Sequence, residues 1–365
     1  MPSTAPTLPP PSSFIPSAHR SEIIASLQST LTTSFALLLC DESNLFISST
    51  SGLRRANLDK LLRIDKQENE ENHDGDNELL EPRLLQTQSA VVSPLPSYDC
   101  IADAQFRNVY SASSSGINIF TTSSLLESAG DAHPIHTFQT HPSPFEKNIE
   151  VNSLYLSPTT STLYSACGDL FGLYAHSTSS SPKFIKNIQP TSGYLHCVTG
   201  SLEDSTVAWG GEDGTVWVMD EREEKINPLN VRDYIIQQKK ASKSQHIYVL
   251  SILIKAPFMY ISGGVESPHT ISQSGYVTSV YLPSSTFLNL SMTDEPVNRL
   301  RMIDGEVCST GRDGGISRWS AELKVCKEGK GEGEGWDLAG WKGGIIKCGG
   351  RGEVFEDFRI CGYID

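Results

Sequence analysis

The sequence has little positive charge. Lysine and arginine total 29 against 43 aspartates and glutamates, which gives a formal net charge of −14. A protein that mainly grips phosphates usually has the opposite sign, so we expect no direct contact with nucleic acid. The two local basic groups, Arg54-Arg55 and the group Lys239, Lys240 and Lys243, are more simply interpreted as solvated loops.

Long apolar runs are also missing. No stretch of about eighteen consecutive apolar residues occurs, so we predict no membrane span. The N-terminal residues are rich in proline and serine rather than basic and then apolar, which predicts no signal peptide. The 8 cysteines include no Cys-x-x-Cys pair and none at zinc spacing with histidine. Several lie in apolar strand patterns, as reduced thiols of a cytosolic or nuclear protein do.

One stretch, residues 194–223, organises the rest of the chain. It predicts three short strands, with a Gly-Gly-Glu-Asp-Gly turn between the second and the third. The Asp-Gly pair supplies the positive φ that a tight hairpin requires. The third strand, Thr215 to Met219, is apolar on both faces, which is typical of a strand packed between other sheets. This unit therefore needs neighbours of its own kind.

The same order of strand, strand, glycine turn and strand recurs along the chain, with the tightest copies near forty residues apart, the period of a propeller blade. We therefore predict an all-β fold, a single WD40-type β-propeller over residues 21–365 with seven blades of four antiparallel strands. Residues 1–20, rich in proline and serine, are predicted to be a disordered tail. Residues 66–97 are predicted to be an acidic and polar disordered insertion between blades one and two.

Catalytic, cofactor and metal sites are not expected. His196 and Cys197 are adjacent on a strand, so their side chains point to opposite faces. The histidines at 133, 136 and 141 share a polar loop with Pro134, where a metal site is improbable. The first strands of the repeats look apolar and offer no cluster of acids at the axis.

Two groups of residues are predicted to have structural or binding roles. Aspartates and glycines of the turns should cap the turn amides; they are Asp169, Asp213, Gly214, Asp313 and Gly314. Trp336 and Trp341 flank a glycine-containing segment near the C-terminus. They could present a partner-binding face, since exposed tryptophan often dominates an interface, or they could pack between the last blade and the first.

Three segments resemble a known family. Residues 193–220 contain GYLHCV and GGEDGTVWVMD, residues 148–169 contain NIEVNSLYLSP and LYSACGD, and the chain ends in GEVFEDFRICGYID. These are similar to the blades of the WD-repeat subunit of the THO complex, subunit 6. The resemblance implies a non-enzymatic nuclear scaffold in a THO/TREX-like complex that couples transcription to mRNA processing and export, and it leaves open whether the scaffold also shuttles to the cytoplasm. It also implies that the protein partners are coiled-coil THO subunits.

Two other functions remain open at this stage. The first is a substrate receptor of a cullin-type ubiquitin ligase, or another generic interaction propeller. Such receptors often end a third strand in Trp-Asp-x-Arg, and here Asp220 and Arg222 keep part of that pattern while Met219 replaces the tryptophan. The second is a propeller enzyme with a metal or carboxylate cluster at its axis.

Overall fold

The structure is a computed structural model of the 365-residue chain. It describes residues 22–30, 34–58, 90–114, 116–138, 150–168, 172–178, 183–189, 193–201, 203–268, 273–329, 334–341, 344–349 and 355–362. Within them the fold is almost entirely antiparallel β-sheet, as the sequence predicts.

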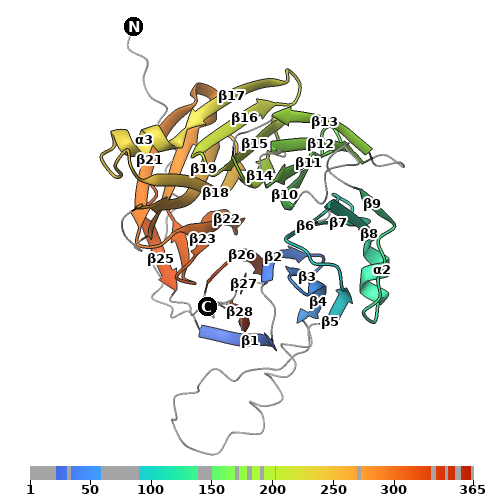
Figure 1. Ribbon diagram of the computed structural model, residues 1–365. Coiled ribbons are helices and arrows are strands. Elements are labelled where there is room, and N and C mark those ends of the chain that lie inside the picture. Colours follow the sequence, from blue (N-terminus) through green and yellow to red (C-terminus); the bar gives the residue numbers. More distant parts are fainter. Residues whose placement is uncertain are drawn as a thin grey trace, which may run out of the picture.

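Six four-stranded blades follow one another along the chain (Figure 1). In each blade the strands lie side by side in chain order, so the first is innermost and the fourth outermost. The bounds are β2 Ser34–Leu39, β3 Asn44–Ser49, β4 Gly52–Asn57 and β5 Ala90–Ser93; β6 Asp99–Ala102, β7 Asn108–Ser113, β8 Gly116–Thr121 and β9 His136–Phe138; β10 Val151–Leu156, β11 Thr162–Cys167, β12 Gly172–Ser177 and β13 Lys183–Gln189; β14 Leu195–Gly200, β15 Thr206–Gly211, β16 Thr215–Asp220 and β17 Lys225–Asn230; β18 His246–Lys255, β19 Phe258–Glu266, β20 Gln273–Tyr281 and β21 Thr286–Thr293; β22 Val297–Ile303, β23 Glu306–Gly311, β24 Ile316–Trp319 and β25 Val325–Gly329.

A closing sheet combines the two ends of the chain. Its order is β1 (Glu22–Thr30), β28 (Phe355–Gly362), β27 (Gly344–Cys348) and β26 (Asp337–Trp341). All neighbours pair antiparallel, and β1 pairs with β28 from Glu22 opposite Gly362 to Thr30 opposite Phe355. The innermost strand β26 contacts β22 on one side and β2 on the other, so this sheet completes the ring.

The prediction of seven blades is therefore wrong as stated. The structure has six blades of four consecutive strands. The last repeat of the sequence does not form a blade by itself, because its strands share the closing sheet with a strand from the other end of the chain. Local repetition cannot reveal such a pairing, since β1 and β28 are separated by almost the whole sequence.

The sequence located triplets of strands and left out most fourth strands. Residues 221–245, which follow the three strands predicted within 194–223, contain β17 and the helix α3 (Val231–Gln237). The predicted tail at 1–20 lies outside the described residues, and so does the predicted insertion up to residue 89. Ala90–Ser93, counted within that insertion, form the edge strand β5.

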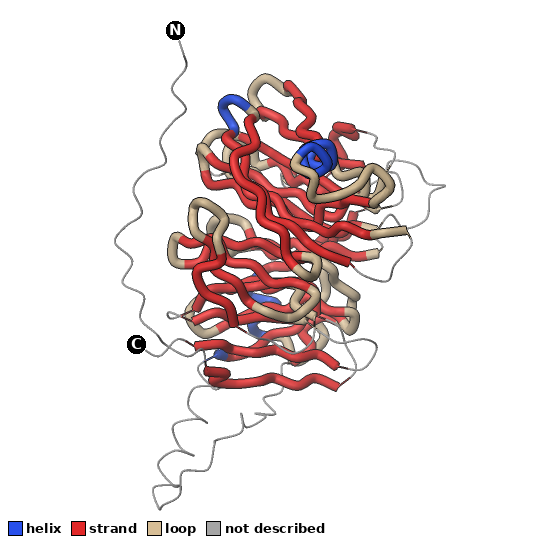
Figure 2. Tube along the Cα trace, turned by 90° about the vertical axis from the view of Figure 1, so that its left-hand side faces the viewer, coloured by secondary structure: helices blue, strands red, loops and turns tan. Residues whose placement is uncertain are grey.

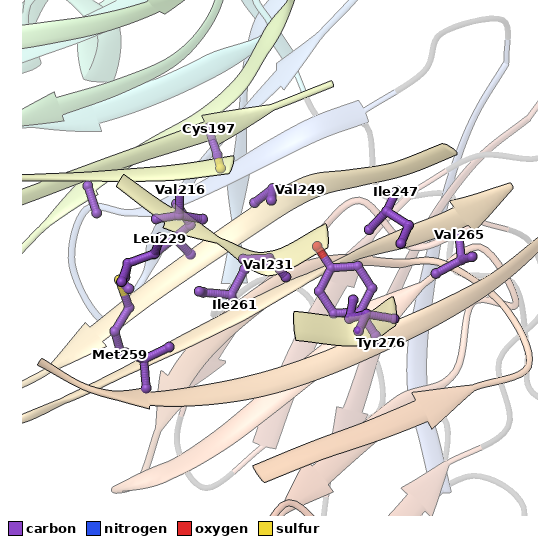
Figure 3. Close-up of a cluster of buried hydrophobic side chains, with 14 residues drawn as sticks. Cys197, Val216, Leu229, Val231, Ile247, Val249, Met259, Ile261, Val265 and Tyr276 are labelled. Carbon is purple, nitrogen blue, oxygen red and sulfur yellow. The ribbon is translucent and has the colours of Figure 1, made fainter. Parts of the chain in front are cut away.

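The cores lie between neighbouring sheets rather than within one. Between the blades of β14–β17 and β18–β21, buried side chains from both sheets interdigitate (Figure 3). Val216 and Val249 come from facing strands, α3 adds Val231 and Ile235, and the buried hydroxyl of Tyr276 donates to the carbonyl of Tyr248 at 3.0 Å. Each sheet is thus stable only against its neighbours, as the apolar faces of the strand at 215–219 predict.

The strands run between two loop-bearing faces, visible when the ring is seen from the side (Figure 2). Each innermost strand begins at the face that also bears the turns between second and third strands, such as the turn from Gly211 to Thr215. We call this the entry face, and the opposite one the exit face. The exit face bears the first-to-second turns, such as the one around Phe106.

Candidate functional site

A β-bulge marks the start of the innermost strands at the entry face. In five of them the register shifts by one residue, at Phe35, Asn152, His196, Leu250 and Asn298. In β6 and β26 the residue just before the strand occupies the same place. Tyr98 N donates to Ala112 O at 2.9 Å, and Trp336 N donates to Cys348 O at 2.8 Å. The bulge turns this residue towards the rim and the following residue towards the axis.

The residues that follow the bulges form an inner ring at the axis. They are Ala36, Asp99, Ser153, Cys197, Ser251, Arg299 and Asp337. Four of these residues have a side-chain oxygen that accepts a hydrogen bond from a backbone N–H of the next sheet. The donors are Leu154 N to Asp99 Oδ2 at 2.9 Å, Val198 N to Ser153 Oγ at 3.4 Å, Leu300 N to Ser251 Oγ at 3.0 Å, and Leu37 N to Asp337 Oδ2 at 3.0 Å.

A buried charge network crosses this ring. Arg299 Nε lies 3.1 Å from Asp337 Oδ1, and Arg299 Nη2 lies 3.7 Å from Asp99 Oδ1. Arg301 donates from Nε and Nη2 to the two oxygens of Asp337, at 2.8 Å and 2.7 Å. The Asp337 side chain is fully buried and that of Asp99 is 5 % exposed. Arg299 of β22 thereby joins the sheet of β26 to the sheet of β6, and Arg301 adds a second contact with the sheet of β26.

The electrostatics keep this network charged. Burial alone would raise the pKa of Asp337, but Arg299 and Arg301 outweigh it and lower the pKa to about 2. Burial disfavours the charged form of Arg299 too, but Asp337 and Asp99 reverse this effect and raise its pKa. The Asp337 carboxylate is therefore ionised and neutralised by the two arginines, and it has little freedom to act as a general acid or base near neutral pH.

A cavity of about 210 Å³ lies beside the network. Its walls are the innermost strands β6, β10, β14, β18 and β22, and Asp99, Ser153, Thr199, Ser251 and Arg299 supply polar groups. Cys197 also lines it, and burial raises the pKa of its thiol to about 12. A protonated thiol is a poor nucleophile, so the cavity does not contain an activated cysteine at Cys197.

The expectation that the first strands are apolar at the axis is only half right. Residues such as Leu37, Leu154 and Ile252 are buried as expected, but the inner-ring charges were missed. A signal was present, because Tyr98-Asp99-Cys100 and Trp336-Asp337-Leu338 repeat one pattern, an aromatic residue, an aspartate and an apolar residue. Acids do converge on the axis, and they do so as ion pairs with arginine.

The residues at the bulge position of three neighbouring sheets form a group that we call the apolar arc: Phe35, which lies in a bulge, and Trp336 and Tyr98, which occupy the same place before their strands. The ring of Phe35 makes edge-on contacts with both others, at centroid distances of 5.5 Å to Tyr98 and 6.1 Å to Trp336. All three side chains are half-buried. Trp336 also packs on the cluster of Leu37, Leu45 and Ile346, which corresponds to the packing alternative for this residue. Trp341 ends β26, and its side chain is outside the described part.

Across the same face lies a polar group that we call the glutamate arc. Glu212 binds two histidines, with His196 Nε2 at 3.0 Å from Oε1 and His246 Nε2 at 3.1 Å from Oε2. His246 Nδ1 lies 3.7 Å from Glu266 Oε2, and the hydroxyl of Tyr248 donates to Glu266 Oε1 at 3.3 Å. The hydrogen bond from His196, less the opposing effect of burial, lowers the pKa of Glu212. Both carboxylates are exposed by 38–40 %.

The predicted turn residues sit at the entry face. Asp213 Oδ1 accepts from Thr215 N at 2.9 Å, and Asp313 Oδ1 accepts from Gly315 N at 3.0 Å. Gly214 and Gly314 adopt φ of +70° and +69°. A Cβ on Gly214 would lie 2.6 Å from Ile247 O. Both the positive φ and this close approach therefore require glycine at position 214. Asp169 lies outside the described residues.

A buried serine–histidine pair in the third blade has an equivalent serine–tryptophan pair in the sixth blade. Ser165 Oγ lies 2.9 Å from His176 Nε2, and at the equivalent register Ser309 Oγ accepts from Trp319 Nε1 at 2.8 Å. His176 is fully buried, and burial lowers its pKa to about 3. Met219 occupies the same position in the fourth blade. The pair is therefore a variant of a core hydrogen bond, closed to any substrate.

Within the described part of the chain, no group of three or more histidine, cysteine or acidic residues has a geometry that could hold a metal ion. Of the three histidines considered from the sequence, His136 lies in β9 and His141 is outside the described residues. None of the described helices is both long and apolar enough to cross a membrane.

Comparison with known proteins identifies the fold. No protein-family model matches the chain, and no curated protein matches it in sequence. The crystal structure of the WD40 β-propeller domain of Doa1 is similar to it, with a TM-score of 0.62 and 13 % sequence identity, over 92 % of this chain and 96 % of that chain. At this identity the likeness establishes the WD40 β-propeller fold.

Proposed function

We propose that this chain is a non-enzymatic scaffold that binds protein partners, within a THO/TREX-like nuclear complex that couples transcription to mRNA processing and export. The observation that carries the scaffold role is the state of the axis. The charged groups of the inner ring form ion pairs with one another and accept hydrogen bonds from backbone amides of neighbouring sheets. These groups therefore stabilise the ring. The rims are then the surfaces left for function, as is usual for WD40 propellers.

The finer assignment rests on the sequence. The segments at 148–169, 193–220 and the C-terminus resemble the WD-repeat subunit of the THO complex. The net charge of −14 also supports a role that faces proteins rather than RNA. Coiled-coil subunits of such a complex are the proposed partners, and the nucleus is the proposed location.

The competing assignment, a receptor for a cullin-type ubiquitin ligase, depends on residues 219–222. Asp220 Oδ1 accepts from Arg222 N at 2.8 Å, which holds the end of β16 in a turn. Glu221 between them binds the third blade, through Ser157, Thr160 and Tyr164 at 2.8–3.0 Å. This segment is thus used in part to join two blades.

Affinity purification of the tagged full-length chain from nuclear extract, followed by mass spectrometry, tests the proposal. We expect coiled-coil THO subunits, at levels well above a parallel purification with the tag alone. Recovery of the ligase adaptor instead would favour the receptor assignment. If purified complexes contain neither, both assignments are wrong.

A further inference from the structure

The entry face bears both an apolar surface and a group of carboxylates. The apolar arc of Trp336, Phe35 and Tyr98 is followed, in the next sheet, by the bulge residue Asn152. Asn152 Oδ1 accepts from the hydroxyl of Tyr194 at 3.1 Å, and the ring of Tyr194 lies 5.1 Å from that of His196. Asn152 and Tyr194 therefore extend the glutamate arc to β10, whose neighbour β6 follows Tyr98 of the apolar arc.

The apolar arc offers a place for an apolar side chain. Its three rings are half-buried, so each keeps part of its surface accessible while its base is fixed by the core. Leu95, three residues before Tyr98, is 39 % exposed and lies between two exposed prolines. Aromatic edges and faces held in this way gain further energy from another aromatic ring.

The glutamate arc offers a place for a cation. Glu212 and Glu266 lie on either side of the imidazole of His246, and the rings of Tyr194, His196 and Tyr248 surround them. Among the described residues, the ion pairs of Glu212 and Glu266 are with histidines, and the charge of the nearby Arg312 acts on Tyr248. Arg312 hydrogen-bonds to Gln273 and pairs with Glu334 at 3.0 Å. Carboxylates beside aromatic rings favour lysine or arginine through both charge and cation–π contacts.

We infer that the entry face binds an extended peptide segment of a protein partner, in which an aromatic residue seats on the apolar arc and a lysine or arginine reaches Glu212 and Glu266. The inference rests on the proposed scaffold function and adds the face and the chemistry of the partner. An acidic partner is disfavoured, because it would approach the same carboxylates in a chain whose net charge is −14.

The test uses three fluorescein-labelled synthetic peptides and the full-length chain, with binding measured by fluorescence anisotropy. One peptide contains a tryptophan and two arginines, the second replaces the arginines with glutamates, and the third replaces the tryptophan with alanine. We expect the first to bind roughly tenfold more tightly than either other peptide, and this preference to shrink as salt is raised.

Variants of the chain then locate the site. Tyr98→Ala and the double variant Glu212→Gln/Glu266→Gln are each expected to weaken the first peptide by roughly three- to tenfold. The matched controls Phe106→Ala and Glu203→Gln remove an exposed aromatic residue and an exposed carboxylate at exit-face turns, and should leave its affinity unchanged. Thermal unfolding confirms that each variant is folded.

Equal affinity for the arginine and glutamate peptides would overturn the inference, and so would unchanged binding by the entry-face variants. The nuclear purification separates this failure from a failure of the scaffold function. If the wild type and Glu212→Gln/Glu266→Gln recover the same partners, the scaffold stands and the entry-face site is wrong. If the wild type recovers none, the scaffold function itself is wrong.

Discussion

Neutralising Asp337 should destabilise the whole ring, because its carboxylate is the shared acceptor of three sheets. It accepts from Leu37 N in the first blade, from Leu338 N in its own strand, and from Arg299 and Arg301 in the sixth blade. In Asp337→Asn the amide group would face donors, and two arginines would lose their main counter-charge.

The expected magnitude follows from burial. Asp337 is fully buried and Arg299 is 16 % exposed, so this pair approaches the case in which removal of one partner costs about 3–5 kcal/mol. Arg301 is 39 % exposed, and water screens part of its loss. We therefore expect Asp337→Asn to lower the free energy of unfolding by about 3 kcal/mol.

Urea unfolding at neutral pH, followed by fluorescence and far-UV circular dichroism, measures this change. The matched control is Glu306→Gln, which breaks the ion pair with Arg318. The side chains of Arg318 and Glu306 are 17 % and 28 % exposed, so this variant should lower the free energy of unfolding by about 1 kcal/mol. The double variant Asp337→Asn/Arg299→Gln should lose less than the sum of its single variants, because it removes an uncompensated charge. A loss within about 1 kcal/mol of the control would refute the view that this network holds the ring together.

Three further changes test other parts of the fold. His176 has a pKa lowered from 6.5 to about 3 by burial, so its contribution to stability is complete above pH 6.5 and is lost as the pH falls towards 3. Between about pH 7.5 and 5, the wild type should lose about 2 kcal/mol more free energy of unfolding than His176→Phe, as measured by urea unfolding; equal losses would contradict this. Gly214→Ala should cost about 2–4 kcal/mol from its positive φ and the clash with Ile247 O, against about 1 kcal/mol for Gly305→Ala, which has a φ of +81° and open space around it. Exposed Cys326 should react with iodoacetamide well before buried Cys100 and Cys197, whose pKa burial raises to about 12, and mass spectrometry of the native protein would show a different order if these thiols were reactive.

The fold class could be predicted because each repeat carries its own local evidence. Turn glycines and strand patterns are set by residues close in sequence, and the strand predicted from Thr215 to Met219 differs by one residue from β16, Thr215–Asp220. Fourth strands such as β17, which contains Pro228 and exposed residues, carry little apolar pattern. The closing sheet depends on pairing between β1 and β28, which leaves no local trace.

The candidate site was harder to predict for a related reason. Trp336 was identified only together with Trp341, while the other members of the apolar arc, Phe35 and Tyr98, come from sheets about 300 and 240 residues away in sequence. Arg299 and Arg301 are separated from Asp337 by more than thirty residues, and charged residues in a strand usually indicate a solvent-facing side. Only the ring places these residues beside one another.

The bulge position at the innermost strands explains why neighbouring residues have different roles. A bulge reverses which side chain faces the axis, as at Phe35. At the equivalent position of β26 and β6, Trp336 lies on the rim while Asp337 lies in the inner ring, and Tyr98 and Asp99 repeat the arrangement. The rim residue can change without disturbing closure, whereas the residue after it is tied to the next sheet by a backbone N–H. Substitutions at Tyr98 should therefore alter partner choice at little cost in stability, and substitutions at Asp99 should do the reverse.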